Sequence, residues 1–164
     1  NAGLIETDAQ GRIVSWKAFS QRAGGTAEIR LADPEDTEAA AALKTVMDQL
    51  AADPDSGILE ILTGEEARSR GGFPEAAYVL VSQKGYELRD DVTGSYCRTR
   101  LTQKAQHGYS ENFPEMRASF MLTGEGISKG QISNVRLIDV APTLAGLMHF
   151  VLPDAEGRDV LKQM

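Results

Sequence analysis

Histidine is the side chain here best suited to proton transfer or metal binding near neutral pH, and the sequence holds two. His107 lies in the run Gln106–Tyr109, between a polar stretch and a later apolar segment. The glycine that follows it leaves room for the close approach of another group. The imidazole could be a metal ligand or a structural residue of a loop, and the triplet alone leaves both open. His149 is expected late in the last helix, where packing or a contact with the helix dipole explains it.

The remaining reactive side chains form no recognisable catalytic group. Glu65 and Glu66 are adjacent on an expected helix, so they point in different directions and are interpreted as helix-start charges. Asp90 and Asp91 are interpreted as a solvated turn. Cys97 is the single cysteine, which excludes an internal disulfide, and we expect it to be partly buried rather than reactive. No Ser-His-Asp triad can be assembled from the pattern.

Short apolar or alternating segments bounded by turn residues predict several strands. The run 27–31 alternates with period two, as a half-buried strand should, and the apolar run 77–81 is the best candidate for a central strand. The predicted strands cover residues 4–6, 12–16, 27–31, 57–62, 77–81 and 118–122. Residues 84–104 are polar and predict no regular element.

Three helices are expected. Residues 33–36 combine a capping aspartate, a proline and carboxylates, which favours a helix start. That helix should end near Asp53, because Pro54 disfavours helical backbone in the residue before it. A short helix is expected from residue 63 to the glycines at 71 and 72, and another begins at Asp139 and runs to Met148. The first helix carries an apolar stripe made of Ala39, Leu43, Val46, Met47 and Leu50.

The sequence from His107 onward carries a longer pattern. Residues 107–120 read His-Gly-Tyr-Ser-Glu-Asn-Phe-Pro-Glu-Met-Arg-Ala-Ser-Phe, followed by Gly124-Glu125-Gly126. This run resembles the C-terminal motif of the nucleotide pyrophosphatase/phosphodiesterase family of the alkaline phosphatase superfamily. The run from Asp139 to Thr143 is similar to that superfamily's Asp-x-x-Pro-Thr helix start, and residues 152–158 look like the family's tail. Residues 3–5 and Trp16 fit, less specifically, the segment that follows the family's Asp-His-Gly motif.

The resemblance implies a fold, a metal and a reaction. The fold would be α/β, a mixed sheet with packed helices, forming the C-terminal part of an alkaline-phosphatase-like fold. His107 would correspond to the last protein ligand of one zinc in a two-zinc site, which activates a Thr or Ser nucleophile in the complete family. The family's other ligands and its nucleophile have no counterpart in this sequence.

These implications predict the C-terminal portion of a zinc-dependent hydrolase for phosphate diesters, nucleotide pyrophosphates or phosphonates. The chain alone is expected neither to bind zinc tightly nor to catalyse the reaction, because a single imidazole cannot build the site. Its expected partners are the missing N-terminal part of the same protein and a small phosphate-ester substrate. A non-catalytic interaction or ligand-binding domain that keeps the scaffold is the alternative.

Composition limits the other partners. Residues 3–164 fit one α/β region, and residues 1–2 are interpreted as an expression scar or, alternatively, a processed terminus. The formal net charge of −7 argues against nucleic-acid binding or membrane-surface binding through a basic face, and no apolar run is long enough to span a membrane. Self-association through an unpaired strand edge is expected. No compartment follows from the sequence.

Overall fold

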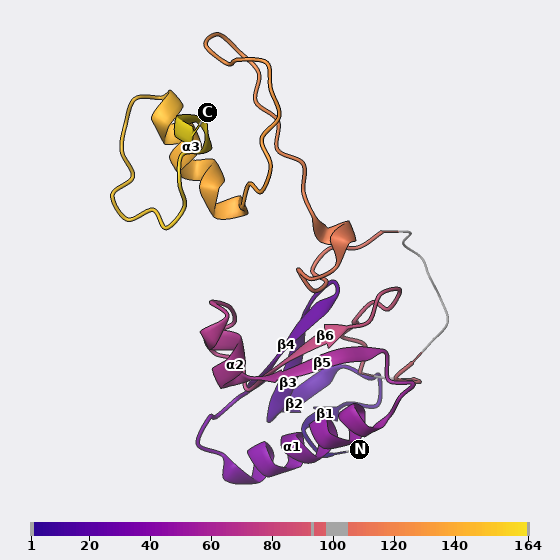
Figure 1. Cartoon of the computed structure of the whole chain (residues 1–164). Helices are drawn as coiled ribbons and strands as arrows, with labels where there is room; N and C mark the ends of the chain where they lie inside the picture. Colours follow the sequence, from indigo (N-terminus) through magenta and orange to yellow (C-terminus); the bar gives the residue numbers. More distant parts are fainter. Residues whose placement is uncertain (1, 93, 98–104, 164) are drawn as a thin grey trace. The chain divides into compact units, whose positions relative to one another are not determined.

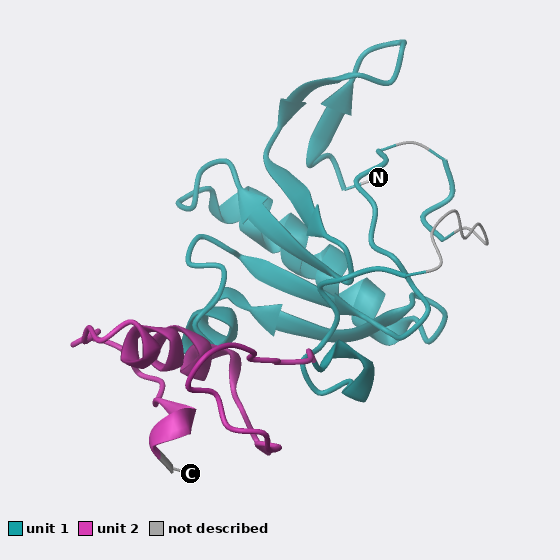
Figure 2. Ribbon diagram, turned by 90° about the horizontal axis from the view of Figure 1, so that it is seen from above, with its two compact units in different colours: residues 1–117 teal, residues 118–164 magenta. Residues whose placement is uncertain are grey.

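The computed structural model describes residues 2–92, 94–97 and 105–163 (Figure 1). The chain forms two compact units, residues 1–117 and residues 118–164 (Figure 2). The first unit is a mixed α and β structure, and the second contains short helices. No helix in the described ranges is long and apolar enough to cross a membrane.

The first unit is built on a four-stranded sheet in the order β3 (Ala18–Ala23), β4 (Thr26–Leu31), β6 (Tyr78–Ser82), β5 (Ile58–Thr63). Each neighbouring pair is antiparallel, so the expectation of a mixed sheet was wrong. Between β3 and β4 the chain reverses through Gly24 and Gly25, and so short a turn can join only antiparallel strands. The interior position of β6 confirms the prediction of a central strand at 77–81.

Both faces of β6 are covered, because its successive side chains point to opposite sides of the sheet. Leu80 belongs to a buried cluster on one face, whereas Val79 and Val81 belong to a second cluster on the other. Helix α1 (Thr37–Ala52) covers the first face with Leu43 and Met47 (Figure 1). Helix α2 (Gly64–Ser69) contributes Ala67 to the second cluster.

Helix α1 has the predicted stripe and the predicted end, but its start differs. Ala39, Leu43 and Met47 are buried, and Val46 and Leu50 pack partly buried against them. The helix begins at Thr37 rather than at Asp33, because Asp36 is the residue whose carboxylate accepts the Ala39 N–H, at 2.9 Å. It ends at Ala52, and Asp53 is the extended C-cap residue before Pro54, which agrees with the predicted end near Asp53.

The charges at the start of α2 are also structural, as predicted. The Glu66 carboxylate accepts the Thr63 backbone N–H at 2.7 Å, and the Thr63 hydroxyl accepts the Glu66 N–H at 3.2 Å. This reciprocal capping satisfies two backbone donors of the first turn. Hydrogen bonds from Thr63 lower the pKa of Glu66 below its usual value.

The N-terminal residues form a separate hairpin of β1 (Ile5–Thr7) and β2 (Ile13–Trp16), as predicted. Every residue of β2 is exposed. The Trp16 ring meets Phe19 of β3 edge-on, with ring centroids 4.5 Å apart. Strand β3 was not predicted, because its sequence has one large apolar residue and no alternation to reveal it.

In the second unit, the predicted strand at 118–122 is absent, since these residues have no regular structure. A strand needs a neighbour for its backbone hydrogen bonds, and none of the described strands pairs with this segment. The regular elements of the unit are η2 (Leu137–Asp139), α3 (Val140–Leu147) and η3 (Val160–Gln163). The short 3₁₀ turn η1 (Pro114–Met116) belongs to the first unit.

The second unit is organised around Asp139, which is fully buried. Its carboxylate accepts hydrogen bonds from the Arg136 guanidinium at 2.9 Å, the Arg136 N–H at 2.9 Å and the Arg158 N–H at 3.1 Å. The Arg136 side chain, followed by the two backbone donors, holds the pKa of Asp139 well below its usual range. Thr143, also buried, donates to the Asp139 carbonyl at 2.6 Å and accepts the Val160 N–H at 3.1 Å. The Asp-x-x-Pro-Thr run therefore ties α3 to residues 158–160.

His149 is not in the last helix, which corrects the sequence prediction. Helix α3 ends at Leu147, and His149 adopts a left-handed conformation with φ of 58°. Its N–H donates to the Gly146 carbonyl at 3.2 Å, and the Phe150 N–H donates to the Ala145 carbonyl at 3.0 Å. These two bonds form a Schellman motif, in which the left-handed residue stops the helix.

Candidate functional site

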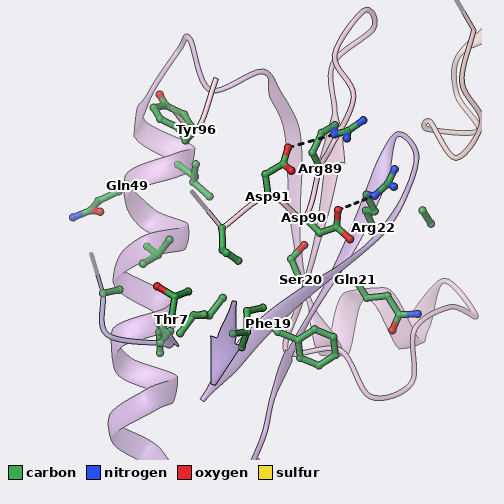
Figure 3. Close-up of a pocket in the computed structure, with 18 of the residues that line it drawn as sticks. Thr7, Phe19, Ser20, Gln21, Arg22, Gln49, Arg89, Asp90, Asp91 and Tyr96 are labelled. Atoms are coloured by element: carbon green, nitrogen blue, oxygen red, sulfur yellow. Dashed lines mark hydrogen bonds and ion pairs between the residues drawn. The ribbon is translucent and has the colours of Figure 1, made fainter. Parts of the chain in front are cut away.

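The first unit contains a groove with a volume of about 1680 Å³ along strand β3 (Figure 3). Its walls come from the β1–β2 hairpin, β3, one side of α1, residues 89–92 and Tyr96. The lining is mainly apolar near Leu4, Ile5 and Val46, and polar near Arg22, Gln49 and Asp90. The groove follows a sheet edge, because β4 is the only neighbour of β3 among the described strands.

His107 is exposed and lines this groove together with Gln106. Within the described residues, no hydrogen bond or ion pair engages its imidazole. Its backbone is held instead, because the His107 carbonyl accepts the Gly25 N–H at 2.8 Å. The side chain is therefore free while the main chain is fixed to the β3–β4 turn.

The close approach expected at Gly108 is real, and the group that approaches is that same turn. Gly108 has φ of 76°, and a Cβ added to it would lie 1.9 Å from the Ala23 carbonyl oxygen. On the facing side, a Cβ on Gly24 would lie 2.3 Å from the His107 carbonyl oxygen. Residues 107–108 and the hairpin turn touch backbone to backbone, so no side chain fits at Gly24 or at Gly108.

The charges along the groove neutralise one another. Arg22 pairs with Asp90 at 3.0 Å (Figure 3). It also pairs with Glu87 at 3.7 Å. Arg89 pairs with Glu87 at 3.5 Å and with Asp91 at 3.5 Å. Asp90 and Asp91 are exposed, as the sequence predicted, but each has an arginine partner. Among the described residues, this end of the groove holds no excess of positive charge that would attract a phosphate.

Protein-family models, curated proteins and solved structures give no match to this chain. The side chains of the groove and their geometry are therefore the basis for inferring a function.

His107 supplies one imidazole, and the described residues do not complete a zinc ligand set around it. The described ranges contain no group of three or more His, Cys, Asp or Glu side chains that could hold a metal. Cys97 is exposed rather than partly buried, because it lies in a segment without regular structure. A zinc at His107 would need ligands beyond those residues, since stable sites use about three or four.

The sequence singled out His107 as a candidate ligand but did not identify the residues that hold its main chain. Gly25 hydrogen-bonds the His107 carbonyl, and the Ser82 hydroxyl bonds the Gly25 carbonyl behind it. The Ser82 and Tyr109 hydroxyls both bond the Tyr86 carbonyl. Such bonds depend on the main-chain path rather than on a residue pattern. The adjacent glycines Gly24 and Gly25 were the available signal in the sequence, because paired glycines are typical of a turn.

Proposed function

We propose that this chain is the C-terminal portion of a two-zinc hydrolase for phosphate diesters, nucleotide pyrophosphates or phosphonates. His107 serves as a ligand of one zinc, and the other ligands and the nucleophile lie outside this chain. The observation that carries the proposal is an exposed imidazole without hydrogen-bond partners among the described residues, on a fixed main chain beside a groove. The resemblance of residues 107–126 to the nucleotide pyrophosphatase/phosphodiesterase motif supplies the reaction class.

The residues of this chain have defined tasks in that proposal. The Gly25 N–H fixes the His107 carbonyl, and the neutral imidazole presents a nitrogen lone pair to the metal. Bound zinc would polarise the phosphoryl oxygens and stabilise the developing charge. The neutralised ion pairs at Arg22 and Arg89 leave the groove suited to the organic part of a substrate rather than to its phosphate.

A second function has its own support. A groove of about 1680 Å³ exceeds the roughly 300–1,000 Å³ of ordinary small-molecule pockets. A groove of this size suits a non-catalytic interaction or ligand-binding domain. Under that alternative His107 contributes only to the surface of the groove.

Zinc calorimetry and a nitrophenyl phosphodiester assay on the purified 164-residue chain test the proposal first. We expect no tight stoichiometric zinc binding and no turnover, because one imidazole loses most of its metal affinity to water. Tight binding that disappears in His107→Ala would show that the chain itself contains further ligands.

The decisive comparison uses a longer protein that includes an upstream Asp-His-Gly motif. There, His107→Ala should lower kcat/KM and zinc content, whereas His149→Ala serves as the matched control and should change neither. A longer protein without zinc-dependent turnover would favour the binding domain. Turnover unaffected by His107→Ala would remove His107 from the site.

A further inference from the structure

We propose that the Gly24-Gly25 turn of the β3–β4 hairpin is the positioning element for the His107 imidazole, and that Ser82 is the positioning residue that fixes this turn. The proposal rests on the proposed function of His107 as a metal ligand. It assigns a role in that site to residues that touch neither metal nor substrate.

The Gly25 peptide is held from both of its sides. Its N–H donates to the His107 carbonyl at 2.8 Å. Its carbonyl accepts the Ser82 N–H at 2.8 Å and the Ser82 hydroxyl at 2.9 Å. Ser82 is fully buried at the end of β6, an interior strand of the sheet. A continuous path of hydrogen bonds therefore leads from the sheet through Gly25 to His107.

The residues on either side of His107 are anchored as well. The Tyr109 hydroxyl donates to the Tyr86 carbonyl at 2.8 Å, and the Ser82 hydroxyl lies 3.2 Å from the same carbonyl oxygen. Before His107, the Gln106 side-chain oxygen accepts the His107 N–H at 3.1 Å. Residues 105–109 have no helix or strand of their own, so these contacts supply the order that regular structure would otherwise give.

The backbone contact leaves no space for adjustment. A Cβ on Gly25 would lie 2.6 Å from the Tyr109 ring, and a Cβ on Gly108 would lie 1.9 Å from the Ala23 carbonyl oxygen. A side chain at either position must push residues 107–109 away from the turn. Since metal ligands must be held close to their productive geometry, such a shift weakens the site while leaving the imidazole present.

The test compares Gly108→Ala with Gly85→Ala. Both glycines have positive φ, 76° and 92°, but a Cβ on Gly85 would meet nothing within 4 Å. The control therefore reproduces the backbone strain without the clash. Ser82→Ala is the second variant and removes the hydroxyl that fixes the turn. NMR relaxation and hydrogen exchange on the 164-residue chain report the order of His107, with His149 as the internal reference.

In the wild-type chain we expect order parameters of about 0.85 at residues 106–109, as in rigid backbone. Gly108→Ala and Ser82→Ala should lower them toward about 0.6 and speed exchange of the Gly25 amide, while the β4–β6 amides stay protected. Gly85→Ala should change neither. Unchanged order at residues 106–109 in both variants would overturn the proposal. If Gly108→Ala also loses β4–β6 protection, Ser82→Ala alone decides.

Zinc affinity in the longer protein then separates the two proposals. Gly108→Ala should weaken zinc binding by roughly 10–100-fold, with the circular dichroism spectrum unchanged, and Gly85→Ala should not. Wild-type zinc affinity in Gly108→Ala, with reduced order at residues 106–109, would overturn the positioning role alone. A wild-type longer protein that holds no zinc would overturn the proposed function, and the metal-positioning role with it.

Discussion

The two units of this chain are stabilised in different ways. The first unit buries two apolar clusters, one on each face of its sheet. In the described part of the second unit, Ala145 and Val160 are the buried hydrophobic residues, and Asp139 and Thr143 are buried beside them. Large apolar side chains remain on its surface, with Leu137 85% exposed and Val151 82% exposed.

This difference predicts which kind of substitution destabilises each unit. The stabilisation from hydrophobic burial scales with buried apolar area. In the first unit it is therefore shared among many side chains rather than supplied by one contact. Hydrogen bonds converge on one carboxylate in the second unit, and a buried donor left unpaired there is costly. We therefore expect the first unit to respond mainly to loss of volume, and the second to loss of single polar groups.

The largest expected effect comes from Leu43→Ala, which should destabilise the first unit by about 2–5 kcal/mol. Leu43 is 3% exposed between α1 and the sheet, so truncation leaves a cavity. Leu144→Ala in the second unit is the matched change, and because Leu144 is 42% exposed it should cost under about 1 kcal/mol. Urea unfolding followed by NMR signals of each unit measures both. Equal losses in the two variants would contradict the comparison.

A smaller effect is expected from Thr143→Val, about 1–3 kcal/mol in the second unit, because the Val160 N–H loses its acceptor. Thr45→Val is the control, since the exposed Thr45 hydroxyl bonds the Ala41 carbonyl of its own helix at 3.0 Å. Hydrogen exchange at residues 140–160 reports the change. If both substitutions leave exchange unaltered, the hydrogen bonds around Thr143 do not hold the unit together.

The smallest expected effect is a loss of stability of the second unit in acid, and it appears only at low pH. The pKa of Asp139 in the folded chain lies below its usual 3.8, because Arg136 and backbone N–H groups favour the carboxylate. Its contribution to stability is therefore complete above pH 3.8 and is lost as the pH falls through the lower folded value. Amide signals of residues 139–160 followed during acid titration measure the loss. Asp139→Asn should remove this acid dependence, and an unchanged dependence would assign it to another group.

Much of the first unit could be predicted, because its elements have local signals. The stripe of α1, the proline after its end and the apolar run of β6 are each readable within a short window. Strand β4 shows where such signals fail. Its alternation suggested one solvated face, yet Glu28 is 4% exposed and pairs with Arg30 at 2.9 Å. Alternation identifies the strand but not what covers its second face.

The wrong strand prediction in the second unit and the unpredicted contact at His107 have a common cause. Residues 118–122 look like a strand, but a strand exists only if another pairs with it, and pairing is not local information. His107 could be singled out from its neighbours in sequence, whereas its contact with Gly25 joins residues far apart in the chain. The fixed main chain beneath the imidazole therefore became visible only in three dimensions.

The contact between Trp16 and Phe19 has an optical consequence. Trp16 is the only tryptophan in the chain, and its ring packs edge-on against Phe19, which lines the groove. Its intrinsic emission therefore arises from one position at the groove wall. A molecule that enters the groove and moves Phe19 changes the surroundings of that indole. The wavelength of its fluorescence maximum thus records occupancy in unlabelled protein, without a reaction and without a metal.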